Sequence, residues 1–296
     1  MKKTPISLFL DSGAFSAKSK GVTIDIDAYI AFIKGNLQHL DVYSNLDVIG
    51  DPVGTWKNQE YMEAQGLKPL PVYHAGEGRK YLDRCLKYGY FAIGGVADSS
   101  NDERAATFDW AFSIVCPKEN NHLPVCKVHG FAITALGMML RYPWYSVDST
   151  SWVMTSRMGS VYVPRFKGGK WIYDENSWKI IVSTRSPAKG DKDKHFDTLS
   201  PEVQNVILDY FHEKGYQVGK SEFRMESKSY KLKSNERWHE GESGGKREVE
   251  LILEEGLSNS YKKRDEMNII YFLDLEKSIP AWPWPFKKSK TGFGLL

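Results

Sequence analysis

Leu8-Phe9-Leu10-Asp11-Ser12-Gly13 is a short apolar run that ends in a carboxylate and is followed by small residues. The apolar residues predict a buried strand, and the glycine allows a ligand to approach the backbone closely. A carboxylate at the end of such a strand either takes part in chemistry or caps the next turn. Because this arrangement recurs along the first half of the chain, it decides which fold we predict.

Short apolar runs alternate with amphipathic segments of helical length in this half. We expect strands at Ser7–Leu10, Leu46–Ile49, Leu70–Tyr73, Phe91–Ile93, Val125–Val128 and Tyr145–Val147. We expect helices between them, at Ile26–Lys34, Thr55–Gln65, Arg79–Tyr88, Asp102–Cys116 and Ala135–Leu140. This alternation is typical of repeated βα units around a parallel sheet.

The residues that follow the expected strands favour a barrel. They can do chemistry or allow close approach: Asp11, Asp51, His74, Gly94 with Gly95, His129 with Gly130, and Asp148. Active sites of barrels are assembled from the carboxyl ends of several strands, whereas an open doubly wound sheet concentrates its site at one switch point. We therefore predict an α/β fold of the (β/α)8 TIM-barrel type, with an open doubly wound sheet as the alternative.

The second half of the chain follows another pattern. We expect a hairpin turn at Lys167-Gly168-Gly169, between Ser160–Pro164 and Lys170–Tyr173, then a strand at Trp178–Ser183 and helices at Pro201–His212 and Lys262–Lys277. Glu226–Lys246 is rich in Lys, Ser, Glu and Gly and predicts a mobile loop, so we interpret residues 220–247 as a basic loop or insertion. The alternating prolines of Pro280–Phe286 exclude a helix there. We expect residues 1–296 to form one barrel domain with a C-terminal hairpin and helical extension.

The composition is that of one globular catalytic domain. The 296 residues are 41% hydrophobic and 26% charged, enough for one large core, and the net charge of +3 is nearly neutral. The three cysteines show no CxxC spacing and the histidines no HxH or HExxH spacing, so we expect no metal and no cofactor. No apolar stretch is long enough to span a bilayer. We expect a cytoplasmic protein without a membrane partner.

Two acids are the strongest candidates for catalysis. Asp11 ends the first apolar run, and Asp148 ends another and is followed by Ser149 and Thr150, whose hydroxyls could keep its carboxylate ionised. Asp148 could instead cap the segment that follows it. In a glycosyl transfer through a covalent intermediate, one carboxylate attacks the anomeric carbon and a second acid moves protons. The pair fits this division of roles.

Four motifs resemble those of the tRNA-guanine transglycosylase family. Leu10–Ser16 (LDSGAFS) resembles DSGGFQ, and Ala92–Ala97 (AIGGVA) resembles IGGLAVGE. Lys127–Ala132 (KVHGFA) stands where the family has MGVGTP, and Val147–Thr150 (VDST) where it has FDCVLPTR. All four occur in the family's order over the first half of the chain.

The resemblance implies a role for each matching position. Asp148 would be the nucleophile and Asp11 the general acid and base. The base-binding residues would be Ser12, Phe15 (stacking on the base), Asp51 (on its Watson–Crick edge, with Asp47 as second choice), His74 (in the place of a glutamine), Gly94, Gly95, Val96 and Gly130. Contacts to nucleic-acid phosphates would come from Arg157 and from the basic segment, through Lys228, Lys231 and Lys233.

The chain also departs from the tRNA enzymes. It lacks their CxCxxC zinc cluster, and Asp11 lies near the start, where those enzymes have a preceding strand. We expect Trp178–Ser183 to supply that strand and close the barrel. Short zinc-free chains with such motifs look most like the phage and bacterial DNA transglycosylases. This likeness implies a pentosyltransferase that exchanges guanine in DNA for a 7-deazaguanine such as 7-cyano-7-deazaguanine.

Three alternatives stay open at this point. The polymer could be tRNA, as in the queuine-type enzymes. The chain could be a non-catalytic nucleic-acid-binding partner subunit, although such a subunit has no need of either acid. The same two acids could also serve a hydrolytic nucleosidase that uses water.

Overall fold

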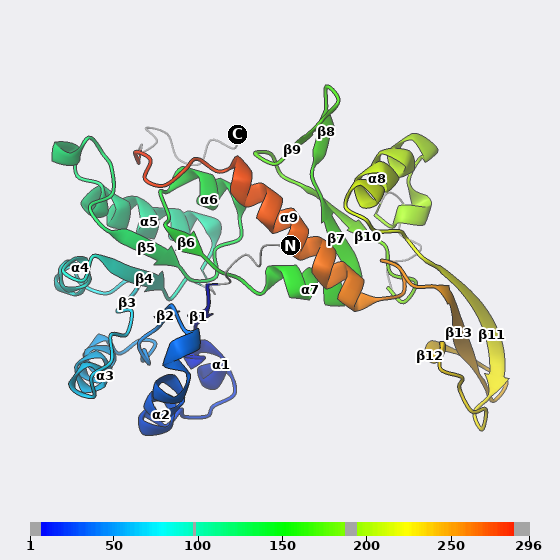
Figure 1. Ribbon diagram of the computed structural model, residues 1–296, viewed down its shortest axis with the longest axis horizontal. Helices are drawn as coiled ribbons and strands as arrows, with labels where there is room; N and C mark the ends of the chain where they lie inside the picture. Colours follow the sequence, from blue (N-terminus) through cyan, green and yellow to red (C-terminus); the bar gives the residue numbers. More distant parts are fainter. Residues whose placement is uncertain (1–6, 97–98, 187–193, 287–296) are drawn as a thin grey trace. The chain divides into compact units, whose positions relative to one another are not determined.

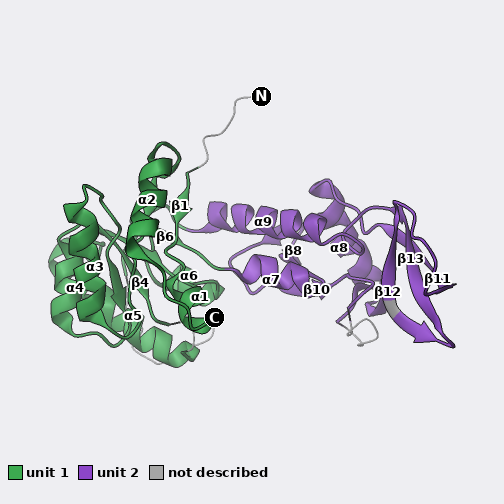
Figure 2. Cartoon of the chain, turned by 90° about the horizontal axis from the view of Figure 1, so that it is seen from below, with its two compact units in different colours: residues 1–149, 280–296 green, residues 150–279 purple. Residues whose placement is uncertain are grey.

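The computed structural model describes residues 7–96, 99–186 and 194–286 (Figure 1). The chain divides into two compact units, residues 1–149 with 280–296 and residues 150–279, where we expected one domain (Figure 2). The second unit has an apolar core of its own, built around Val161, Val163, Ile207, Phe211 and Met267. The apolar core is therefore divided between the two units.

Six parallel strands run through the first unit in chain order. They are β1 (Phe9–Leu10), β2 (Val42–Tyr43), β3 (Val72–His74), β4 (Tyr90–Gly94), β5 (Lys127–Gly130) and β6 (Ser146–Val147). β1 pairs with β2, β3 to β6 form a four-stranded sheet, and a parallel bridge between Ser44 and Leu70 joins the two groups. This order lacks the reversal of a doubly wound sheet. No pairing within the described ranges joins β6 to β1, so the closed barrel stays a prediction.

Helices follow these strands: α1 (Ala14–Ser19), α2 (Ile26–Asn36), α3 (Pro52–Ala64), α4 (Arg79–Leu86), α5 (Asn101–Val115) and α6 (Leu136–Arg141). Short 3-10 turns lie at Leu37–His39 and Lys118–Asn120. α5 begins with a capping box, in which Ser100 and Glu103 satisfy each other's backbone N–H groups. The helices bury large apolar side chains such as Ile33, Met62, Leu82 and Phe108. All five helices expected in this half are confirmed, within a turn at each end.

The strand expected at Leu46–Ile49 is wrong. The second strand comes earlier, at Val42–Tyr43, and the chain then leaves the sheet. The first two turns of α3 hold this loop, because Thr55 Oγ1 accepts the N–H of Val48 at 2.9 Å and Asn58 donates to the carbonyl of Leu46 at 2.7 Å. Asp47 therefore lies in a braced loop beyond the end of β2.

The proline-rich tail belongs to the first unit and is not helical, as predicted. Phe286 is buried, with its ring centroid 5.6 Å from that of Tyr142, and its N–H donates to the carbonyl of His122 at 2.9 Å. Trp282 packs edge-on against Tyr145 at 5.3 Å. Aromatic contacts thus hold this segment against the α5 and β6 region.

The second unit combines helices with antiparallel strands. Its elements are α7 (Ser151–Arg157), β7 (Ser160–Val163), β8 (Arg165–Lys167), β9 (Lys170–Ile172), β10 (Trp178–Ile181), a 3-10 turn (Phe196–Thr198), α8 (Pro201–Glu213), β11 (Lys220–Ser227), β12 (Glu236–Ser243), β13 (Lys246–Glu254) and α9 (Tyr261–Ser278). The hairpin turn is confirmed, with Gly168 and Gly169 at φ of 55° and 77°. Its first strand is β8 and not the expected segment Ser160–Pro164, where β7 pairs with β10 instead. None of the helices in the described ranges has both the length and the apolar composition needed to cross a bilayer.

Two expectations for this unit are corrected. Trp178–Ser183 does not join the parallel sheet, because β10 pairs antiparallel with β7 and buries Ile180 and Val182 in the second unit's own core. Residues 220–247, expected to be a loop, instead belong to an antiparallel sheet ordered β11-β13-β12. Charged residues hide its strands in the sequence: Glu250 is fully buried in β13, where Arg237 donates to it at 2.7 Å.

Candidate active site

Three acids from separate segments share one site in the first unit. Asp11 follows β1, Asp47 lies beyond β2, and Asp148 follows β6. The pKa of Asp11 is raised, first because surrounding protein displaces water from its carboxyl, and then by the negative charges of Asp47 and Asp148. Backbone N–H groups of Ser12 and Gly13 act in the opposite direction and do not offset the rise. The side chain still reaches solvent, so it is open to a ligand.

Asp47 is held at both oxygens. Ser12 Oγ donates to its Oδ1 at 2.9 Å, and His74 Nε2 lies 2.8 Å from its Oδ2. Ser12 and His74 are buried, with 6% and 4% of their surface exposed. The orientation of Asp47 is therefore set by the segment after β1 and by the end of β3.

His74 lies between two carboxylates, because its Nδ1 is 3.0 Å from Glu77 Oε1. Burial lowers the pKa of His74, but the hydrogen bonds to Asp47 and Glu77 outweigh burial and raise the pKa to about 9. Two glycines let β4 approach this ring: a Cβ at Gly95, where φ is 74°, would stand 3.0 Å from His74 Cβ. Sequence reasoning missed Glu77, although a histidine that follows a strand and precedes a glutamate by three positions was a usable signal.

Asp148 is oriented by the loop after β5. Its Oδ1 accepts the N–H of Ala132 at 2.9 Å, and His129 Nε2 lies 3.7 Å from the same oxygen. The His129 ring is buried and stacks on Phe9 with 4.4 Å between centroids. Its Nδ1 is 2.8 Å from Ser146 Oγ, which in turn is 2.9 Å from the hydroxyl of Tyr90. A chain of polar groups therefore lies behind Asp148.

The other expected base-binding residues fall into two groups. Phe15 is half exposed on α1, and Gly95 is exposed after β4, so both are open to a ligand. Gly94, Val96 and Gly130 are buried, and a Cβ at Gly130 would come within 3.0 Å of Trp144. These three positions affect the site through their packing and their backbone conformation.

Asp51 has a different place from the one expected. Its Oδ1 accepts the N–H of Gly54 at 3.0 Å, so it caps α3. Asp47, the second choice from the sequence, is the acid that joins Ser12 and His74.

The residues expected to contact phosphates all belong to the second unit. Arg157 stacks over Tyr261 at 4.9 Å, and Lys228 pairs with Glu242 at 2.9 Å. Lys231 and Lys233 are exposed between β11 and β12. The site described above consists of first-unit residues alone.

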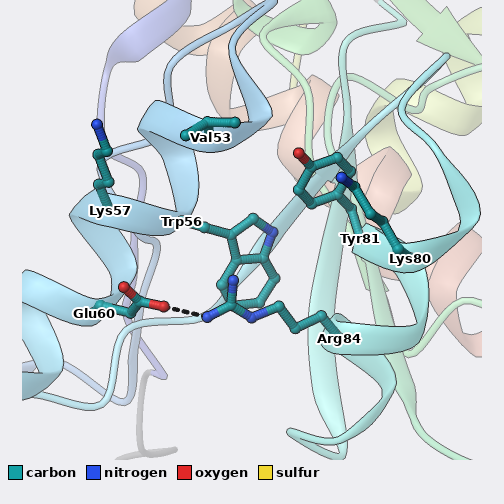
Figure 3. Close-up of a pocket in the computed structure, with 7 residues that line it drawn as sticks. All are labelled: Val53, Trp56, Lys57, Glu60, Lys80, Tyr81 and Arg84. Atoms are coloured by element: carbon teal, nitrogen blue, oxygen red, sulfur yellow. Dashed lines mark hydrogen bonds and ion pairs between the residues drawn. The ribbon is translucent and has the colours of Figure 1, made fainter.

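A separate cleft lies between α3 and α4 (Figure 3). It has a volume of about 370 Å³ and is lined by Val53, Trp56, Lys57, Glu60, Lys80, Tyr81 and Arg84. Arg84 lies over the Trp56 ring at 4.1 Å and pairs with Glu60. None of the three site acids lines this cleft, so it is not the candidate active site.

No cluster that could hold a metal is found in the part of the chain that the structure describes. The cysteines Cys85, Cys116 and Cys126 are buried thiols, and burial raises the pKa of each. The chemistry of the site therefore has to be argued from carboxylates, imidazoles and backbone groups.

Comparisons with protein-family models, with curated proteins and with solved structures give no match to this chain.

Proposed function

We propose that this chain is a pentosyltransferase that exchanges guanine in DNA for a 7-deazaguanine, such as 7-cyano-7-deazaguanine. The observation that supports this most is the electrostatic coupling of Asp11 to Asp148. The pKa of Asp11 is raised by desolvation and by neighbouring negative charge, whereas Asp148 accepts a backbone N–H. One acid is thus suited to carry a proton, and the other has an oxygen oriented by a backbone donor for attack.

The proposed reaction has two displacements at the anomeric carbon. In the first, Asp148 attacks C1′, the bond from C1′ to the guanine nitrogen breaks, and Asp11 gives its proton to the departing base. In the second, the entering 7-deazaguanine loses a proton to Asp11 and attacks C1′, which releases the Asp148 carboxylate. Atoms and charge balance, and no further reactant is needed.

Asp47 is the proposed reader of the base in place of Asp51. A carboxylate only accepts hydrogen bonds, so it suits a purine edge that presents N–H donors, as guanine and 7-deazaguanines do. Phe15 would stack on the base, and the backbone at Gly94 and Gly95 would line its other edge. Taking the base out of a duplex costs a few kcal/mol. The exposed Lys231 and Lys233, with Arg157 and Lys228, are proposed to contact phosphates.

Trapping of the covalent intermediate tests this proposal. Wild-type protein is incubated with guanine-containing DNA, denatured, and examined for a protein–DNA adduct. Asp148→Asn and Asp148→Ala are expected to abolish the adduct, and Asp51→Asn is the matched control because it alters only a helix cap. Equal trapping by the wild type and both Asp148 variants would show that Asp148 is not the nucleophile.

The polymer and the reaction class are tested by base exchange. DNA and tRNA carrying labelled guanine are each incubated with the protein and a 7-deazaguanine. We expect label to leave DNA and the 7-deazaguanine to enter it. Exchange only into tRNA would refute DNA as the substrate, and release of guanine without incorporation would indicate a hydrolase.

A further inference from the structure

The buried imidazole of His74 is clamped between two acidic side chains. Its Nε2 is 2.8 Å from Asp47 Oδ2 and its Nδ1 is 3.0 Å from Glu77 Oε1. Only 5% of its side-chain surface is exposed, with 10% for Asp47 and 6% for Glu77. Both contacts are thus screened from bulk water.

This geometry determines where the protons lie. An ionised carboxylate can only accept hydrogen bonds, and a neutral imidazole has one donor and one acceptor nitrogen. A neutral His74 would direct a lone pair at one of the two carboxylates. Only the imidazolium, with a proton on each nitrogen, satisfies both contacts at once.

The groups around the clamp fit a single positive charge at His74. From β4, the neighbours are Gly94 and Gly95, which carry no charge. The hydroxyl of Tyr73 donates to the backbone carbonyl of Glu77 at 2.7 Å. Burial and then the negative charge of Glu77 raise the pKa of the Cys85 thiol. Asp47 and Glu77 are therefore the acidic groups in contact with His74, and Asp11 is the next acid beyond Asp47.

The clamp leaves His74 with no ring nitrogen for a ligand. The glutamine whose place it takes would bind the base directly, whereas both nitrogens of His74 are already used. Its effect on a ligand has to pass through Asp47, whose other oxygen is held by Ser12.

We propose that His74 is a positioning residue, held as a cation by Glu77, that fixes the orientation of Asp47 as a hydrogen-bond acceptor for the ligand. That the ligand is a purine edge rests on the proposed function; the clamp itself does not. Glu77 is the distinctive member, because it touches His74 and lies on the side of the ring away from Asp47. A charge at Glu77 therefore acts on the ligand only through the imidazole.

Nuclear magnetic resonance of the histidine rings tests the clamp without any substrate. In the full-length wild type near neutral pH, both His74 nitrogens are expected to carry protons, with a titration midpoint at about 9. His74→Gln assigns the signals, and the exposed His39 serves as internal reference. Glu77→Gln is expected to lower the midpoint by about one pH unit or more, because a neutral amide replaces the anion.

Binding of free guanine, measured by calorimetry, tests the effect on the ligand. Between about pH 6 and about pH 8.5, the wild-type affinity is expected to stay constant, whereas that of Glu77→Gln falls as its His74 loses a proton. His39→Gln is the matched control and should behave as the wild type. If Glu77 had a purely structural role, Glu77→Gln would weaken guanine binding equally at every pH.

The outcomes separate this inference from the proposed function. A singly protonated His74 in the wild type at neutral pH, or a Glu77→Gln variant whose midpoint and affinity profile match the wild type, would overturn the clamp. A doubly protonated His74 in a wild type that binds no guanine would support the clamp and count against the proposed function.

Discussion

His129 places its buried Nε2 3.7 Å from Oδ1 of Asp148, and within the described part of the chain this nitrogen has no hydrogen-bond partner. If the hydroxyl of Ser146 donates to Nδ1, then Nε2 carries the ring proton and directs it at the carboxylate. A small movement of Asp148 would close this gap. The N–H of His129 would then hold the Asp148 carboxylate in one orientation for attack on C1′.

His129→Phe tests this role, because phenylalanine keeps a ring to stack on Phe9 but removes both nitrogens. A reacting group that is misplaced by about 1 Å loses up to about 100-fold in rate, so adduct formation is expected to slow by roughly 10- to 100-fold. Ser146→Ala should slow adduct formation less, because it removes only the hydroxyl that fixes which ring nitrogen of His129 carries the proton. The rates come from single-turnover trapping, with His39→Phe as control. Adduct formation by His129→Phe at the wild-type rate would contradict the role.

The raised pKa of Asp11 predicts a pH effect with a definite sign. Asp11 gives a proton to the leaving base, so activity should fall as pH rises through its pKa, above the ordinary carboxyl range. Asp47→Asn removes one of the negative charges that raise this pKa, so the falling limb should move to lower pH. Asp51→Asn, which only alters a cap, should leave the limb in place. The test is the pH profile of single-turnover rates, and an unmoved limb in Asp47→Asn would refute the coupling.

The same shift bears on stability. An acid whose folded-state pKa is raised binds protons more tightly when folded, so stability is lost as pH rises through that pKa. Asp11→Asn should therefore be more stable than the wild type at neutral pH, and the difference should shrink in acid. Urea unfolding at both pH values measures this. A variant less stable than the wild type at neutral pH would count against desolvation of Asp11.

The sequence predicted much of the first unit, because most strands there are apolar runs followed by a polar residue or a glycine. Asp11 and Asp148 were singled out for this reason. Asp47 was ranked below Asp51 because the strand was expected at Leu46–Ile49, and Asp51 lies just beyond the end of that segment. Glu77 and the polar chain behind Asp148 depend on distances between loops and neighbouring strands, which spacing alone does not give.

The second unit was harder to predict, because its strands carry charges on buried as well as exposed positions. Glu250 is fully buried in β13, where Arg237 and Ser221 donate to its carboxylate. Because the residue is a glutamate, the sequence does not indicate that its position is buried. The strand Trp178–Ile181 was recognised, but its partner was not, because apolar alternation does not specify which sheet a strand joins.

His74 predicts an alkaline loss of stability. Its pKa rises from 6.5 to about 9 on folding, so its contribution is fully present below the unfolded value and is lost as pH rises through about 9. The shift corresponds to roughly 3 kcal/mol as an upper limit. His74→Gln should lack this component, so the difference in unfolding free energy between wild type and variant should shrink between about pH 7 and about pH 10. A constant difference would contradict the shift.

Phe286 anchors the proline-rich tail to the first unit. Its ring stacks on Tyr142 and contacts Phe112, and only 3% of its surface is exposed. Phe286→Ala should lower the free energy of unfolding by about 3 kcal/mol, because it leaves a cavity in an aromatic cluster. Phe32→Ala is the control, since Phe32 is 54% exposed. Equal effects of the two substitutions in urea unfolding would show that the tail packs loosely.

Ala132 directs its N–H at Asp148 from a left-handed backbone conformation, with φ of 60°. This conformation costs an L-residue about 1–2 kcal/mol, and glycine avoids that cost but loses more entropy on folding. Ala132→Gly should therefore gain up to about 1 kcal/mol in unfolding free energy while it keeps the N–H and the rate of adduct formation. In contrast, Ala31→Gly, in the exposed interior of α2, should lose about 1 kcal/mol. If Ala132→Gly is destabilised as much as Ala31→Gly, the loop that orients Asp148 is not strained.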